Sequence, residues 1–317
     1  EKGYYDPSSG KRFSFREAYH PLSPVGMRVC AARVWSVYRR SAPSQTFDDD
    51  FHRGVEGSED FPLFIKPDTP LGVRDVMELM RDHFEGTPYD MTEGIDAGPF
   101  ACPYRWRGLT WEVDDVEYVW ERPISTQQAA FVMVTQSRDW LPDPVGGVYW
   151  HTPDDCFTTP FTPFYAGTNR VPRAFAQGDI DRFSWDSAWW VYNIVSNLTY
   201  NTYSRIMPEV AAAQDEVEDA IFAMLPAVEE TASKLYEQDP ELASRFLTTF
   251  SVSTAEGTLE RWRELGTHIL TKFNDGFVRS SEEETEGVGY PETWLRRVIG
   301  ENPDQLRVPG WGRDSDE

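Results

Sequence analysis

Hydrophobic and polar positions alternate along the first half of the chain with two different periods. Within residues 73–84 the apolar side chains recur every three or four positions, which predicts a short amphipathic helix that Gly86 and Pro88 would end. Residues 129–136 are dense in β-forming side chains and predict a strand. Residues 147–151 follow turn-forming Pro and Gly residues, so we expect the two strands to form an antiparallel hairpin.

The second half of the chain carries helical patterns. Ser184 is a suitable N-cap for a helix that begins at Trp185 and continues to Met207, with its apolar side chains along one stripe. Pro208 fits either the first turn of a following helix or a kink. Further helices are predicted at residues 209–225, 227–237, 259–273 and 290–299.

Two segments leave the type of element open. Residues 27–38 are apolar almost throughout, and so continuous a run fits either a buried strand or a helix. Residues 158–165 contain two prolines, which suits an edge strand or an extended loop. We therefore expect residues 1–180 to be mostly strands and loops with one helix, and residues 181–317 to be mostly helical. This arrangement is typical of the α+β class.

Composition narrows the classes of function. The 317 residues are 40% hydrophobic, which is enough to fill a core. The formal net charge of −23 argues against nucleic-acid binding, because that affinity depends on clustered Lys and Arg. No apolar run approaches the roughly 20 residues that span a bilayer. We expect a soluble protein that binds neither nucleic acid nor membranes.

Cysteine and histidine positions do not predict a metal site. Cys30, Cys102 and Cys156 are far apart and odd in number, which indicates neither a disulfide framework nor a thiolate zinc site. His83 lies close to acidic residues, but the sequence offers no second group of ligands to complete a site. We predict no metal and no cofactor.

The residues that lead into and out of the first predicted strand are candidates for substrate binding. Arg138 follows the strand, where its guanidinium could hold a carboxylate in a bidentate manner or form an ordinary ion pair. Ser125, Thr126 and Gln127 precede the strand. They could line a pocket as neutral donors or simply satisfy the edge of a sheet.

The second predicted strand supplies two further candidates. Trp150 and His151 are adjacent, so they face opposite sides of the strand. His151 is also close in sequence to Cys156, which suggests a Cys–His pair. A buried, inert cysteine is the commoner situation, and Asp154 and Asp155 suit a turn.

Four strings of residues carry a resemblance to a known family. They are Gly3-Tyr4-Tyr5-Asp6-Pro7, residues 75–90 with Arg81-Asp82-His83-Phe84-Glu85-Gly86-Thr87-Pro88-Tyr89-Asp90, Glu121-Arg122-Pro123-Ile124-Ser125-Thr126, and Phe183-Ser184-Trp185-Asp186-Ser187-Ala188-Trp189-Trp190. Taken together and in this order, the strings resemble the dipeptidase A family of bacterial cysteine peptidases, which are N-terminal-nucleophile (Ntn) hydrolases. The resemblance spans nearly the whole chain.

The resemblance implies a fold, an activity and a mechanism. The implied fold is an αββα sandwich, with two antiparallel sheets stacked between helical layers, and the implied activity is dipeptide hydrolysis. In that family the mature enzyme begins with a cysteine, whose thiolate attacks the peptide carbonyl while its own α-amino group acts as base. An α-amine suits this role because its pKa is about 7.7–8.0. Residue 1 of this chain is Glu, so no catalytic residue is assigned here.

We therefore expect residues 1–317 to be the carboxy-terminal portion of one Ntn-hydrolase domain. In this interpretation the chain is a partial αββα sandwich, completed by an amino-terminal segment that carries the catalytic cysteine. Strands left at the break would expose unpaired backbone groups at ~1–3 kcal/mol each, so we expect the chain to be inactive and unstable without its complement. The expected ligand is a small peptide. A homo-oligomer is compatible with the sequence. The cellular location stays open between the bacterial cytoplasm and export.

Two alternative functions remain to be tested. Related Ntn folds cleave acylated amines, so an amide acylase that acts on a non-peptide substrate is one alternative. The 12 Trp and 14 Tyr residues suggest another, a non-enzymatic module that binds peptides or carbohydrates. Exposed aromatic platforms would support that module, whereas buried aromatic residues would count against it.

Overall fold

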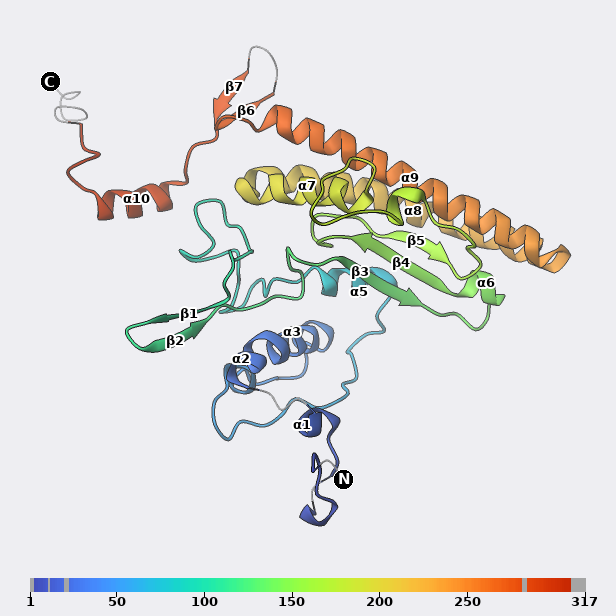
Figure 1. Ribbon diagram of the computed structural model, residues 1–317, viewed down its shortest axis with the longest axis horizontal. Coiled ribbons are helices and arrows are strands. Elements are labelled where there is room, and N and C mark those ends of the chain that lie inside the picture. Colours follow the sequence, from blue (N-terminus) through green and yellow to red (C-terminus); the bar gives the residue numbers. More distant parts are fainter. Residues whose placement is uncertain (1–2, 11, 20–22, 281–283, 309–317) are drawn as a thin grey trace.

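A three-stranded antiparallel sheet is the centre of the molecule. The computed structural model describes residues 3–10, 12–19, 23–280 and 284–308 (Figure 1). The sheet contains β3 (Phe131–Gln136), β4 (Val148–Pro153) and β5 (Thr162–Tyr165) in the order β3-β4-β5. The short helix α6 (Asp143–Gly146) lies in the connection between β3 and β4. The predicted hairpin is confirmed, and the proline-containing segment forms an edge strand.

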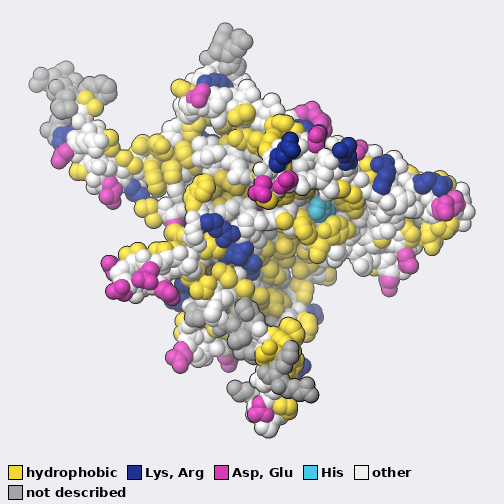
Figure 2. Space-filling model, in the orientation of Figure 1, with side chains coloured by type: hydrophobic (Ala, Val, Ile, Leu, Met, Phe, Trp, Pro, Cys, Tyr) yellow, Lys and Arg dark blue, Asp and Glu magenta, His cyan; other side chains and the backbone are white. Residues whose placement is uncertain are grey.

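The two faces of this sheet differ in burial. Val134 pairs with Trp150 across β3 and β4, and both side chains pack into a buried cluster with Leu247. On the opposite face Phe131 and Met133 are 53% and 51% exposed. Figure 2 shows hydrophobic side chains gathered over the region of the sheet. The sheet is therefore covered by this chain's own helices on one face, and its other face is partly open.

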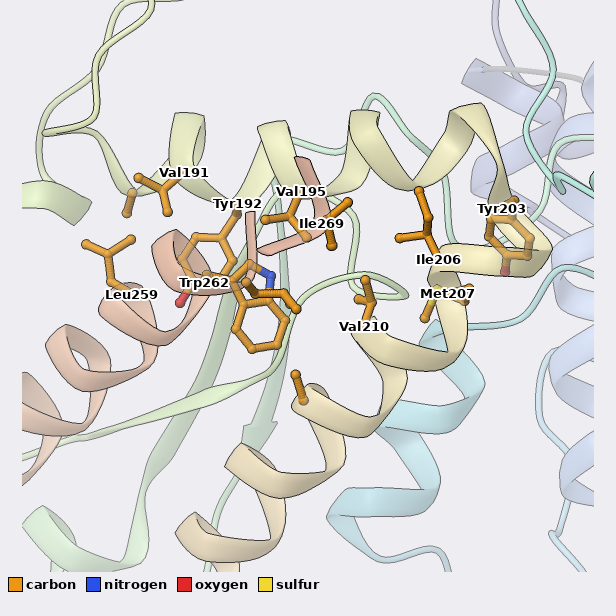
Figure 3. Packing of buried hydrophobic residues seen from close by; sticks show 13 residues of the cluster. Val191, Tyr192, Val195, Tyr203, Ile206, Met207, Val210, Leu259, Trp262 and Ile269 are labelled. Carbon is orange, nitrogen blue, oxygen red and sulfur yellow. The ribbon is translucent and has the colours of Figure 1, made fainter. Parts of the chain in front are cut away.

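Three helices cover the buried face. They are α7 (Ala188–Asn201), α8 (Tyr203–Gln238) and α9 (Pro240–Lys272). Figure 3 shows how their apolar side chains interlock, with Tyr192 of α7, Val210 of α8 and Trp262 of α9 in one cluster. Within the described part of the chain, no helix combines the length and the apolar composition that crossing a bilayer requires.

The boundaries of these helices correct two predictions. The predicted helix from Trp185 to Met207 begins instead at Ala188 and is interrupted at Thr202, whose φ of −136° and ψ of 57° are not helical. Ser184 does not cap it, because its hydroxyl accepts a hydrogen bond from the Asp186 backbone within a preceding turn. Helix α8 conversely continues through Pro208, since buried side chains on both sides of the proline pack into the core and outweigh one lost hydrogen bond.

The N-terminal part is more helical than the sequence pattern predicts. Its helical elements are η1 (Pro7–Ser9), α1 (Phe15–Tyr19), α2 (Pro24–Gly26), η2 (Met27–Ala31), α3 (Ala32–Ser41), α4 (Asp50–Arg53) and α5 (Val73–Met80). The expectation of one helix in residues 1–180 is therefore wrong. Burial decides the ambiguous segment: Ala32 and Trp35 are buried whereas Val34 is exposed, which is a helical period hidden within an apolar run.

The remaining elements are peripheral. They are β1 (Thr110–Val113), β2 (Val116–Val119), η3 (Arg173–Phe175), β6 (Phe277–Arg279), β7 (Thr285–Gly287) and α10 (Glu292–Glu301). The β1–β2 and β6–β7 hairpins and α10 project from the body (Figure 1). The α+β class is confirmed, while the stacking of a second sheet into an αββα sandwich stays a prediction.

Candidate functional site

A buried carboxylate, Asp155, lies just beyond the end of β4 and collects several hydrogen bonds. One of its oxygens accepts from the Ser125 hydroxyl and, at 3.2 Å, from the backbone N–H of Phe157. The other accepts from the Tyr104 hydroxyl and, at 3.0 Å, from that of Tyr200. Burial and the nearby Asp155 raise the pKa of Tyr104 and of Tyr200 well above the usual range. Both phenols therefore remain protonated and donate to the carboxylate.

The hydrogen bonds continue from Tyr104 to a histidine. The Tyr104 hydroxyl lies 2.9 Å from Nε2 of fully buried His83, and Nδ1 of His83 lies 3.0 Å from Glu85. Burial would raise the pKa of Glu85, but hydrogen bonds from His83 lower it to about 2. Glu85 is therefore an acceptor, which places a proton on Nδ1. The Tyr104 hydroxyl thus stands between His83 and Asp155, and Glu85, His83, Tyr104 and Asp155 form one row of hydrogen-bonded side chains.

A second buried carboxylate, Asp82, connects this row to the N-terminal helices. It accepts from the Ser36 hydroxyl at 2.7 Å, from the Arg40 guanidinium at 3.0 Å and from the Phe84 backbone at 3.2 Å. The backbone carbonyl of Asp82 also accepts from the N–H of Ser125 at 3.2 Å. Helix α3, the turn after α5 and the segment before β3 are thereby held in one arrangement.

A third buried carboxylate, Asp154, faces helix α7. It accepts from the Ser196 hydroxyl at 2.7 Å and from the Asn193 amide at 3.1 Å. Burial, with a smaller contribution from Asp155, raises the pKa of Asp154 to about 7 in spite of these hydrogen bonds. Its φ of 64° is left-handed, a conformation that Asp tolerates better than most residues. The chain therefore turns sharply after β4, and the adjacent carboxylates of Asp154 and Asp155 accept hydrogen bonds from different residues.

A small polar pocket adjoins the Asp155 cluster. Tyr104 lines it, together with Thr126 and Gln127. Arginines also line it, namely Arg105, Arg107 and Arg122. Its volume is about 10 Å³, which is room for roughly one water-sized group. A buried tyrosine and three arginines thus surround a space that fits about one water-sized polar group.

Comparison with known proteins identifies the family. The family model for peptidase family C69 matches residues 1–216. The chain belongs to peptidase family C69. This assignment confirms the family resemblance found in the sequence. It does not by itself define the substrate.

Two curated proteins are similar to this C69 chain. A protein named probable dipeptidase, from Salmonella dublin, is 25% identical over 182 residues, which cover 57% of this chain and 36% of that protein. Probable dipeptidase B from Lactococcus lactis subsp. lactis is 24% identical over 213 residues, which cover 62% of this chain and 41% of that protein. The chain thus matches less than half the length of each relative.

The structure of the C69 chain brings three of the predicted residues together. Ser125 is buried and donates to Asp155. Thr126 and Gln127 line the adjoining pocket, where the Gln127 amide donates to the backbone carbonyl of Arg105 at 2.8 Å. These three positions remain candidates for the binding site.

The other three predicted residues lie elsewhere in the C69 chain. Arg138 forms an ion pair with Glu229 of α8 at 2.7 Å and also donates to backbone carbonyls of α6. Of the two roles considered for Arg138, the structure thus shows an ordinary ion pair within the chain. Trp150 is 1% exposed and stacks on Phe222 in the core. His151 faces the partly open side of the sheet, where burial lowers its pKa to about 4.

Cys156 and His151 do not form a pair in the described part of the chain. The Cys156 thiol is fully buried and donates to the backbone carbonyl of Met80 at 3.1 Å. Burial, and then the nearby Asp155, raise the pKa of this thiol. The His151 ring instead stacks on Tyr149. Of the two interpretations of Cys156, a reactive Cys–His pair and a buried, inert cysteine, the structure therefore supports the second.

Among the described residues, one group of carboxylates is close enough to share a cation. The ligand atoms of Asp48, Asp49 and Asp50 lie within 4.8 Å of one another. Their own chain already engages them, because Tyr89 donates to Asp49 and Arg53 pairs with Asp50. No ligand outside this acidic cluster supports a metal site there.

Sequence reasoning missed the centre of the candidate site. It assigned Asp155 to a turn and considered His83 only as a metal ligand. A usable signal was present: two adjacent acidic residues stand shortly after the predicted strand at residues 147–151, and a carboxylate that becomes buried there is costly unless it is paired. Tyr104 had no such signal, because its partners are 21 and 51 residues away.

Proposed function

We propose that the protein is a dipeptidase that cleaves the peptide bond through a cysteine acyl-thioester, with the nucleophilic cysteine supplied by a segment outside residues 1–317. The observation that carries this proposal is the buried Asp155 cluster, which reaches a small cationic pocket through Tyr104 in a chain of a peptidase family. The names of the two relatives, both probable dipeptidases, support the choice of substrate.

The cysteines of this chain are poor nucleophiles, which supports an external thiol. A nucleophilic cysteine needs access to substrate and a means of forming its thiolate. Cys156 is fully buried with a raised pKa, and burial also raises the pKa of Cys102. Cys30 is exposed, but within the described residues no histidine hydrogen-bonds to it. The reacting thiolate and its base are therefore assigned to the terminal cysteine of the additional segment.

The partly open face of the sheet is a suitable seat for that segment. Phe131 and Met133 of β3 present exposed apolar side chains on this face, and the rings of Tyr149 and His151 lie beside them on β4. Burying such a surface against a second sheet is favourable by about 25 cal/mol for each Å² of apolar area. In the resulting αββα sandwich, the terminal cysteine of the additional segment would lie against residues 1–317.

Within the proposed reaction this chain holds and orients groups. The thiolate forms a bond to the carbonyl carbon, the amine of the second residue leaves after protonation, and water then hydrolyses the thioester. Thr126 and Gln127 contribute neutral polar groups at the pocket wall. Tyr104, whose hydroxyl is held between His83 and Asp155, forms part of the pocket wall and is fixed in position by these two contacts.

Reconstitution tests the proposal directly. The chain would be incubated with a dipeptide, alone and together with the amino-terminal segment of the enzyme. We expect hydrolysis only from the mixture, and none when the terminal cysteine of the segment is replaced by alanine. Hydrolysis by residues 1–317 alone would contradict the role assigned to this chain.

The same assay separates the alternatives. A dipeptidase cleaves the dipeptide faster than an N-acyl amine, whereas an amide acylase has the opposite preference. The binding-module alternative is less well supported, because Trp35, Trp150 and Trp262 are all buried. Trp106 and Trp140 are exposed, whereas exposed Phe183 and Trp185 lie edge to face and are the pair that could serve such a module as a platform.

A further inference from the structure

The pocket beside Tyr104 gathers arginines in a strongly acidic chain. Arg107 and Arg122 flank the β1–β2 hairpin, which pairs Thr110 with Val119. The Trp120 backbone continues this pairing by donating to the carbonyl of residue 109. Beyond these paired residues, Arg107 and Arg122 both line the pocket. Figure 2 shows a group of Lys and Arg side chains where this hairpin joins the body.

Several guanidinium N–H groups here are buried without an acceptor. Within the described part of the chain, Nε of Arg122, Nε of Arg105 and Nη2 of Arg33 have no hydrogen-bond partner. Arg33 belongs to the same group, because its Nε donates to the backbone carbonyl of Arg122 at 3.2 Å. Buried donors are rarely left unpaired in native proteins, so an acceptor that enters this region would find three N–H groups free to bind it.

The nearby carboxylates are already engaged. Glu121 also lines the pocket, but it pairs with Arg28 at 2.8 Å. Asp96 pairs with Arg105. Among the described residues, none forms an ion pair with Arg107 or Arg122 through its carboxylate.

Mutual repulsion adds to the electrostatic imbalance. Burial, and then the nearby Arg122, lower the pKa of Arg33. The fold thus holds like charges together, which is costly unless an anion compensates them.

We propose that this arginine pocket, with Arg107 and Arg122 as its principal ligands, binds the free α-carboxylate of the dipeptide substrate. The inference rests on the proposed dipeptidase function and specifies how it recognises its substrate. The volume of about 10 Å³ has room for about one water-sized group, so one carboxylate oxygen would enter the pocket while the rest of the dipeptide stays outside it. Arginine suits a carboxylate because its planar fork can donate two parallel hydrogen bonds. The sequence suggested carboxylate binding by Arg138; in this proposal Arg107 and Arg122 bind the carboxylate instead.

Binding of an uncleavable analogue tests the pocket separately from catalysis. The probe is a dipeptide whose peptide bond is reduced to CH₂–NH, prepared with either a free carboxylate or a carboxamide at its C-terminus. Titration calorimetry would measure the affinity of both forms for the full-length enzyme, for Arg107→Gln and for Arg122→Gln. Arg74→Gln is the matched control, because Arg74 is exposed and pairs with Asp219 outside the pocket.

We expect the carboxylate form to bind the wild-type enzyme about 10- to 100-fold more tightly than the carboxamide. Each pocket variant should lose most of this preference and leave carboxamide binding nearly unchanged, and Arg74→Gln should retain it. Arg122→Lys should restore part of the preference, because it keeps the charge without the planar fork. Arg107 is exposed, so its variant remains informative if Arg122→Gln does not fold.

Other outcomes overturn the inference. Equal affinity of the wild-type enzyme for the two forms would do so, as would variants that weaken both forms equally. Hydrolysis is measured independently on the natural dipeptide. If the wild-type enzyme shows no hydrolysis but retains the carboxylate preference, the proposed function fails and the carboxylate pocket stands.

Discussion

The two ends of the β3–β4 ladder use charge in different ways. At the end where β3 stops, Arg138 pairs with Glu229, and Glu229 also accepts from the Tyr165 hydroxyl at 2.9 Å. At the opposite end, where β4 stops, Asp155 is shared by several donors, and Arg122 lies near them with an unpaired N–H. At the first end Arg138 and Glu229 form an ion pair with each other. At the second end Nε of Arg122 has no hydrogen-bond acceptor among the described residues. An arginine at a strand end can thus be engaged entirely by its own chain, so its presence alone does not indicate a binding site.

Replacing Asp155 should have the largest effect. Asp155→Ala removes the acceptor shared by the Ser125, Tyr104 and Tyr200 hydroxyls, of which Tyr104 keeps His83 as a neighbour, and we expect the free energy of unfolding to fall by about 3–5 kcal/mol. Chemical denaturation of the full-length enzyme measures this loss. Ser125→Ala is the matched control and should cost only about 1 kcal/mol. Similar losses from the two variants would show that Asp155 is not the centre of the cluster.

At the opposite end, Arg138→Ala should destabilise the protein without altering substrate affinity. It leaves Glu229 buried with only Tyr165 as a donor, at a cost of about 2–4 kcal/mol. The KM for a dipeptide should stay within about twofold of the wild-type value, because this end makes no substrate contact. A tenfold rise in KM in a folded variant would return Arg138 to the binding site.

Asp154 should give the protein a specific dependence of stability on pH. Its pKa is raised to about 7 in the folded state, from a usual value near 3.8, so between these values the folded state binds the additional proton. The free energy of unfolding should therefore decrease as pH rises from about 4 to about 7, by about 1 kcal/mol per pH unit from this group. Asp154→Asn should lack this contribution. Parallel stability curves for the two proteins would contradict the assignment.

The smallest effect is expected at Cys156. Cys156→Ala removes a buried thiol and its hydrogen bond to Met80, at a cost of about 1 kcal/mol, and should leave kcat for dipeptide hydrolysis unchanged. Steady-state kinetics of the full-length variant measure this. Loss of activity in a variant that unfolds at nearly the wild-type denaturant concentration would restore Cys156 as a nucleophile.

The elements that the sequence predicts well are those with local signals. The strand at Phe131–Gln136 is marked by β-forming residues, and the helix at Val73–Met80 by its period. Helix α8 was harder, because Pro208 and Pro226 indicate breaks when considered locally. Packing against α7 and α9 supplies the stabilisation that keeps the helix continuous, and packing partners are distant in sequence.

The candidate site was predicted in part for the same reason. Ser125, Thr126 and Gln127 were found because they lead into a recognisable strand. Arg138 was selected by the same local logic, but its partner Glu229 lies 91 residues away and no pattern reveals the pair. Arg122 stands in a string that carries the family resemblance, yet no local pattern reveals that it lines the same pocket as Arg107.

The hydrogen bonds of Asp155 also have a consequence for folding. They join it to Tyr104, Ser125 and Tyr200, at separations of 51, 30 and 45 residues. Closing such long loops costs chain entropy before any hydrogen bond forms, so these contacts belong late on the folding route. A chain with a correct helical hairpin can therefore still lack the Asp155 cluster. Stopped-flow refolding should show helical signal recovering before the burial of Tyr104 and Tyr200.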